Sequence, residues 1–199
     1  MSRTTAAHLV LALIAASTLL ACGGASIRPT GTNEPRLASD RLGSVRSALT
    51  YDGDWMGGVP LPEDLDDDLD LARRRGVATI IDLRDDRART ALPLDDAAVR
   101  VGMDLVVVER NLPSDTIQDL TSEISNAAID SVRDVLNRPG RDGVLLLDDD
   151  GSLSAAVYAI HLAADKGADP SDVLRGARGS GLSDRDADFV RSQVARIGG

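Results

Sequence analysis

Apolar positions along the chain form short continuous runs that alternate with longer stretches of helical spacing. Each run is too short for a buried helix and is rich in Val, Ile and Leu, so each predicts a strand buried on both faces of a parallel sheet. A short extended piece precedes them. The predicted strands are 55–60, 77–82, 103–108 and 143–147. The pattern therefore predicts a small, largely parallel four-stranded sheet.

Apolar residues at helical spacing occupy most of the remaining chain after residue 61. The predicted helices are 62–76, 94–101, 115–137, 152–166, a short helix opened by Asp169-Pro170, and a last helix through Ile197. Ser183 with Asp186 three positions later predicts a capping pair for the last helix. Helices between and after the strands define an α/β sandwich.

The first 21 residues have the pattern of a bacterial export signal. Arg3 precedes an uninterrupted run of apolar and small residues, Leu9–Leu20, which is too short to span a bilayer comfortably. The run ends in Leu19-Leu20-Ala21-Cys22, which resembles a lipobox, so we expect cleavage before Cys22 and its acylation with fatty acids such as palmitate. The expected partner is a lipid bilayer of the cell envelope. Because Gly23 and not an aspartate follows, we expect the periplasmic face of the outer membrane, if the cell has one.

The expected organisation is a signal peptide at 1–21, a flexible tether at 22–47 and one α/β domain at 48–199. The tether assignment follows from a composition rich in Gly, Ser, Thr, Pro and Arg without apolar periodicity. Cys22 is the only cysteine, so an acylated chain has no thiol for catalysis or for a zinc site. The net charge of −10 becomes −11 without the signal peptide and argues against nucleic acid as a partner.

The run at 143–147 leads through an acidic turn, Asp148-Asp149-Asp150-Gly151, into the helix from Ser152. A strand that turns tightly into a helix places free N–H groups at the carboxyl edge of the sheet, where open α/β folds bind ligands. Three consecutive carboxylates would repel an anion there. With no ligand at all, the same residues are explained as a solvated turn.

The order of these pieces resembles the bacterial branch of the dual-specificity and tyrosine-phosphatase-like family. The motifs that carry the resemblance are Gly57-Gly58-Val59-Pro60, residues 76–84 and residues 143–156, and the similarity covers about residues 51–194. It implies a three-layer phosphatase-like sandwich. In that family the turn after the last strand begins His-Cys and ends in an arginine, and an aspartate before the long helix protonates the leaving oxygen.

Carried over residue by residue, the family's histidine falls on Leu147, its cysteine on Asp148 and its arginine on Leu153 or Ser154. Glu109 or Asp115 takes the position of the general acid. The positions of the degenerate phosphate loop are Asp148, Asp149, Asp150, Gly151, Ser152, Leu153 and Ser154. Without the thiolate and the guanidinium, the resemblance implies no catalytic residue, metal or cofactor. We expect a binding or adaptor protein, with an envelope protein as its partner.

An alternative hypothesis uses the same acids as a metal site. Residues 145–153 resemble the first motif of haloacid-dehalogenase-type phosphohydrolases, in which Asp148 would be the nucleophile and Asp150 the acid/base, bridged by Mg²⁺. Ser183-Asp184 and Asp188 imitate the distal metal motif of that family. Only about fifty residues follow the first motif, without a convincing strand, and a helix cap explains Ser183 more simply. His161 is interpreted as a satisfied helix-face residue.

Overall fold

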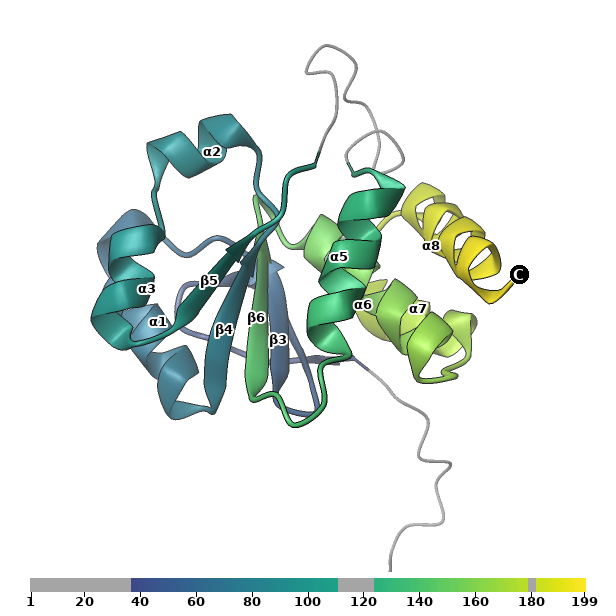
Figure 1. Ribbon diagram of the computed structural model, residues 1–199, viewed down its shortest axis with the longest axis horizontal. Coiled ribbons are helices and arrows are strands. Elements are labelled where there is room, and N and C mark those ends of the chain that lie inside the picture. The colour runs from purple at the N-terminus through teal and green to yellow at the C-terminus, as the bar shows by residue number, and fades with distance from the viewer. Residues whose placement is uncertain (1–36, 111–123, 179–181) are drawn as a thin grey trace, which may run out of the picture. The chain divides into compact units, whose positions relative to one another are not determined.

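The computed structural model describes residues 37–110, 124–178 and 182–199, which belong to one compact unit. These residues form a mixed α/β fold around one sheet, with strand order β1-β2-β3-β6-β4-β5 (Figure 1). The strands are β1 (Ala38–Ser39), β2 (Arg46–Tyr51), β3 (Asp54–Gly58), β4 (Val77–Asp82), β5 (Asp104–Val107) and β6 (Gly143–Asp148). All four predicted strands are present, but the sheet is larger than predicted.

The two additional strands form an antiparallel edge that the sequence did not reveal. β2 pairs antiparallel with β3 through a tight turn, in which Asp52 and Gly53 have φ of 50° and 87°, and such turns favour Asp-Gly. β1 pairs with β2. Leu37, Leu42 and Val45 are buried, so residues 37–47 belong to the folded domain. The expected boundary at residue 48 was wrong, because burial by distant elements is not visible as a local periodicity.

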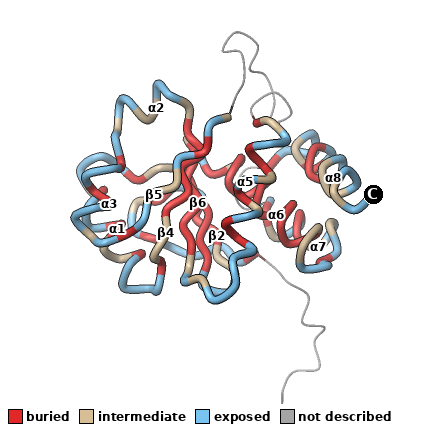
Figure 2. Tube along the Cα trace, in the orientation of Figure 1, coloured by how far each residue is buried: buried red, intermediate tan, exposed pale blue. Residues whose placement is uncertain are grey.

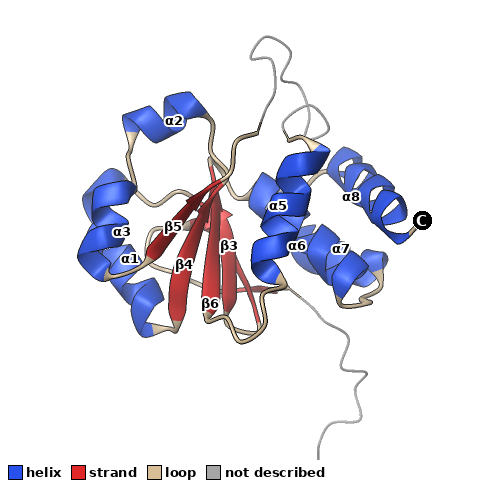
Figure 3. Cartoon of the chain, viewed as in Figure 1, coloured by secondary structure: helices blue, strands red, loops and turns tan. Residues whose placement is uncertain are grey.

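Helices cover both faces of the sheet, as Figure 3 shows. Their bounds are η1 (Pro62–Asp64), α1 (Leu65–Arg74), α2 (Asp86–Ala91), α3 (Asp95–Val101), α5 (Asn126–Leu136), α6 (Ser152–Asp165), α7 (Pro170–Ala177) and α8 (Asp184–Gly198). One core packs β6 residues Val144 and Leu146 with α5, α6, α7 and α8. The other packs Leu145 and Leu147 with α1 and α3. The three-layer α/β sandwich is therefore confirmed, with the central strands buried on both faces (Figure 2).

The predicted helices agree with the structure where caps or apolar spacing marked them. The capping box of Ser183 and Asp186 is present at the start of α8. The long helix expected at 115–137 begins only at Asn126, after an N-cap by Ser125, and residues 111–123 lie outside the described part. α2 was missed because it buries no residue. In the described residues, no helix combines the length and apolarity needed to cross a membrane.

Candidate functional site

The acidic turn lies where the sequence predicted, at the carboxyl end of the central strand β6. β6 lies between β3 and β4, and the turn passes into α6 through Gly151, whose φ is 100°. The turn packs closely against β3: a Cβ on Gly58 would lie 2.8 Å from the carbonyl carbon of Asp150. Glycine is required at both positions, at Gly58 by this contact and at Gly151 by its left-handed backbone.

The first amide groups of α6 are bound by carboxylates of the turn itself. Asp148 accepts hydrogen bonds from the backbone N–H groups of Leu153 and Ser154, both at 3.2 Å. Asp150 accepts one from the N–H of Ser152 at 2.9 Å and one from its hydroxyl at 2.7 Å. The amides at a helix N-terminus are the usual anion-binding groups of such a turn. Here the chain supplies the anions.

Asp148 and Asp150 titrate as an interacting pair. Asp148 is 3% exposed, and burial raises its pKa to about 6. The negative charge of Asp150 also raises this pKa, whereas the hydrogen bonds from Ser154 and Leu153 lower it. Burial also acts to raise the pKa of Asp150, but hydrogen bonds from Ser152 and Asp148 and the charge of Arg46 lower it below its usual range. The proton taken up near pH 6 therefore resides mainly on Asp148.

Two arginines that the sequence analysis did not single out lie at the mouth of the turn. Arg46 on β2 donates to the backbone carbonyl of Asp149. Arg110, after β5, lies 3.2 Å from the carboxylate of Asp149 and also donates to the carbonyl of Leu83. No local signal could have identified them, because they are 103 and 39 residues from Asp149 in sequence. Both guanidinium groups therefore contact Asp149 of the turn.

Solved structures with the same arrangement include TpbA from P. aeruginosa, with a TM-score of 0.59 and 17% identity over 82% of this chain and 94% of that one. They also include a kinase-associated phosphatase with its catalytic cysteine replaced by serine, with a TM-score of 0.55 and 15% identity over 85% and 97% of the two chains. Tk-PTP in its active form gives 0.51 and 17% over 72% and 92%. The chain has the fold of the dual-specificity and tyrosine phosphatases.

No family model and no curated protein matches the chain. At 15–17% identity the solved structures establish the fold and not the chemistry. The chemistry must be argued from the residues of this chain. The expected strand, turn and helix at 143–156 are confirmed as elements, and Asp148 lies at the junction between strand and turn.

The other predicted site residues are dispersed. Glu109 is exposed and pairs with Arg89 at 2.9 Å, so it is one member of a surface ion pair. Asp115 and Cys22 lie outside the described residues. Ser183 and Asp186 cap α8, and Asp184 pairs with Arg178. In the part of the chain that the structure describes, no three His, Cys, Asp or Glu side chains are grouped to hold a metal ion.

Proposed function

We propose that this chain is a lipid-anchored envelope protein whose phosphatase-fold domain binds a partner and does not hydrolyse phosphate esters. The observation that carries the proposal is the self-capped turn. The carboxylates of Asp148 and Asp150 accept from the amides of Ser152, Leu153 and Ser154. A phosphoryl group would need those same amides.

The carboxylates of the turn oppose a phosphate there, and the two arginines at its mouth, Arg46 and Arg110, are already bound to Asp149. A unit negative charge about 4 Å from a carboxylate is repelled by about 1 kcal/mol in water and by more in a cleft. Attraction to the helix dipole contributes about 0.3–1 kcal/mol and is already used by the two carboxylates. The resemblance also gives the position of the attacking thiolate to Asp148 and that of the phosphate-binding arginine to Leu153 or Ser154. The turn therefore lacks both the nucleophile and the clamp of the family.

An assay of the purified chain with p-nitrophenyl phosphate, with and without Mg²⁺, tests the loss of hydrolysis. We expect no turnover above the uncatalysed rate, and none that differs between the native chain and Asp148→Asn. Turnover by the native chain that disappears in Asp148→Asn but persists in Asp184→Asn would overturn the proposal. If that turnover required Mg²⁺, it would establish the haloacid-dehalogenase-type alternative.

The alternative has weaker support. Both carboxylate oxygens of Asp148 accept hydrogen bonds from backbone N–H groups at the start of α6. Within the described ranges no strand follows β6, whereas the alternative needs further strand ends for its lysine and second acidic pair. Lys166, the only lysine, lies beyond the far end of α6, about 20 Å from the turn at 1.5 Å per residue.

The membrane anchor rests on the sequence pattern before Cys22. We expect metabolic labelling with palmitate to depend on that residue and the protein to fractionate with membranes. In Cys22→Ala both properties should be lost, whereas Ser26→Ala, a few residues on, should retain them. Labelling of Cys22→Ala at the native level would remove the lipoprotein part of the proposal and leave the proposed binding function unaffected.

Crosslinking in intact cells tests for an envelope protein partner, by comparing the proteins captured with Cys22→Ala and with Ser26→Ala.

A further inference from the structure

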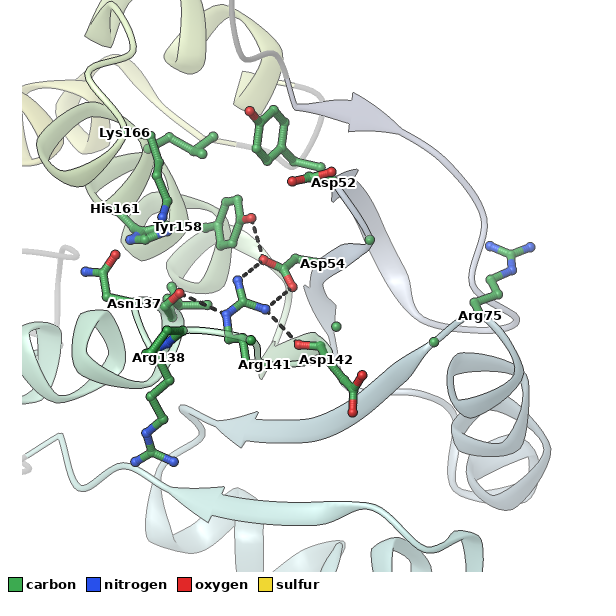
Figure 4. A pocket seen from close by; sticks show the side chains of 18 residues that line it. Asp52, Asp54, Arg75, Asn137, Arg138, Arg141, Asp142, Tyr158, His161 and Lys166 are labelled. Atoms are coloured by element: carbon green, nitrogen blue, oxygen red, sulfur yellow. Dashed lines mark hydrogen bonds and ion pairs between the residues drawn. The ribbon is translucent and has the colours of Figure 1, made fainter.

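A cavity of about 540 Å³ lies at the opposite end of the sheet from the acidic turn. The tip of the β2–β3 hairpin, residues 136–143 and the C-terminal half of α6 line it (Figure 4). β6 begins at this cavity with Gly143 and ends at the turn with Asp148. The volume is in the range of sites that hold small organic ligands.

The floor of the cavity is a buried, charge-balanced network. Asp54 is 2% exposed and receives a two-point ion pair from Arg141 at 2.6 and 2.5 Å. The hydroxyl of Tyr158 donates to the same carboxylate at 2.7 Å, and the N–H of Val144 donates at 2.9 Å. The carboxylate is thus neutralised, so an anion in the cavity would not meet an uncompensated negative charge at the floor.

One wall presents an oriented histidine. His161 is buried, and its Nδ1 lies 3.0 Å from a carboxylate oxygen of Asp165. Arg133 binds both oxygens of Asp165, at 2.9 and 2.6 Å. Burial alone would raise the pKa of Asp165, but hydrogen bonds from Arg133, His161 and Asn137 lower it to about 2. Asp165 is therefore an ionised carboxylate that accepts a hydrogen bond from the Nδ1–H of His161, which leaves Nε2 of a neutral His161 as a hydrogen-bond acceptor.

The same wall carries a second cation, Lys166. Lys166 follows the last residue of α6, and Figure 4 shows its side chain extending toward His161. The pKa of His161 is lowered mainly by burial, and the positive charges of Lys166 and Arg141 lower it further. Within the described residues Lys166 makes no ion pair, whereas Arg141 is bound to Asp54.

We propose that this cavity binds a small organic anion that carries hydroxyl groups, either a hydroxy-carboxylate or a sugar phosphate. Lys166 would bind the anionic group with Arg141 behind it, and His161 Nε2 would accept a hydrogen bond from a hydroxyl. Exposed carboxylates of Asp52 and Asp142 also line the cavity, so we expect ligands with three or more negative charges to bind more weakly. The site is independent of the proposed function, because it lies at the other end of α6 from the turn.

NMR titration of the imidazole of His161 tests the site directly. The full-length chain with His8→Gln has a single histidine, so one set of ring signals reports on the cavity. We expect saturable shifts of these signals with gluconate or with glucose 6-phosphate, and the anion that binds identifies the source of the negative group. Glucose and acetate, which each lack one of the two recognised features, should bind at least about tenfold more weakly.

Substitutions then separate specific binding from general electrostatics. Lys166→Gln should weaken binding at least about tenfold, and Lys166→Arg, which keeps the charge, should largely restore it. Arg87→Gln removes an exposed positive charge from α2 and should leave binding unchanged. The proposal fails if neither anion gives a saturable shift, if acetate and glucose bind as tightly, or if Lys166→Gln and Arg87→Gln behave alike.

Discussion

Asp54 and Asp148 are buried carboxylates at opposite ends of two paired parallel strands, and they differ in what neutralises them. Asp54, at the start of β3, is bound by the guanidinium of Arg141 and the hydroxyl of Tyr158. Asp148, at the end of β6, is bound by two backbone N–H groups, and Asp150 adds negative charge beside it. A buried charge with a full ionic partner is tolerated, whereas one that depends on dipoles tends to take up a proton.

The two buried carboxylates therefore have opposite effects on the stability of the fold at neutral pH. The ion pair of Asp54 joins the hairpin tip to the start of β6 and to α6, which stabilises the fold. The environment of Asp148 shifts its pKa upward, which costs stability at neutral pH. Shifts of this kind occur often at functional sites, although structural networks produce them too. Substitutions at each end measure the contrast.

The largest loss of stability is expected for a substitution of Asp54, whose carboxylate is paired with Arg141. Asp54→Ala leaves the partly buried Arg141 without its partner and removes a buried carboxylate that also binds Tyr158, so we expect the free energy of unfolding to fall by about 3–5 kcal/mol. Urea unfolding at pH 7 measures the loss. Asp142→Ala, which removes an exposed carboxylate from the same loop, should change the value by less than about 0.5 kcal/mol. Equal losses in the two variants would contradict a special role for the Asp54 ion pair.

Asp165 extends the comparison, because it is a second carboxylate bound by a guanidinium. Its pKa of about 2 lies below the unfolded value of about 3.9, so it stabilises the fold above pH 4 and loses that effect as the pH falls toward 2. Asp165→Asn should lower stability by about 2 kcal/mol at pH 7 and by little at pH 2. The exposed residue Asp188, changed to Asn, provides the control. If the native chain and Asp165→Asn differed in stability by the same amount at pH 2 and at pH 7, the charge of Asp165 would not be what stabilises the fold.

Local signals explain how much of the fold could be predicted. The apolar runs at 77–82 and 143–147 and the capping pair of Ser183 and Asp186 depend on neighbouring residues, and each was confirmed. β1 and β2 gain their stability from contacts with distant elements. The chain around Leu42 therefore resembled a tether, although that residue is fully buried.

The candidate site divides in the same way. The strand, turn and helix around Asp148 were predictable from the run of residues itself. That Asp148 bends back to the amides of Leu153 and Ser154 depends on side-chain direction, which composition does not encode. The network of Asp54 was missed entirely, because its partners Arg141 and Tyr158 lie 87 and 104 residues away in sequence.

At Asp148, which unlike Asp54 and Asp165 has no ionic partner among the described residues, the contribution to stability should change with pH in the opposite direction. With a folded pKa of about 6, above the unfolded value of about 3.9, Asp148 contributes stability below pH 4 that is lost as the pH rises through 6. Asp148→Asn removes this loss, so we expect a gain of about 1–2 kcal/mol at pH 8 that vanishes by pH 4. Unfolding measured from pH 4 to pH 8 tests the sign, with Asp188→Asn, at an exposed position on α8, as the control. Destabilisation at pH 8 would show that the amides of α6 need the charge of Asp148.

The smallest effect separates the two causes that raise the pKa of Asp148. Burial acts whatever the neighbours are, whereas repulsion requires the negative charge of Asp150. Asp150→Asn removes that charge, so the pKa of Asp148 should fall by roughly half a unit to one unit, equivalent to about 1 kcal/mol or less. A carbon-13 NMR titration of the Asp148 carboxyl group measures it, with Asp149→Asn as the control for a general change in charge. An unchanged pKa would mean that burial alone raises the pKa of Asp148, without a contribution from the charge of Asp150.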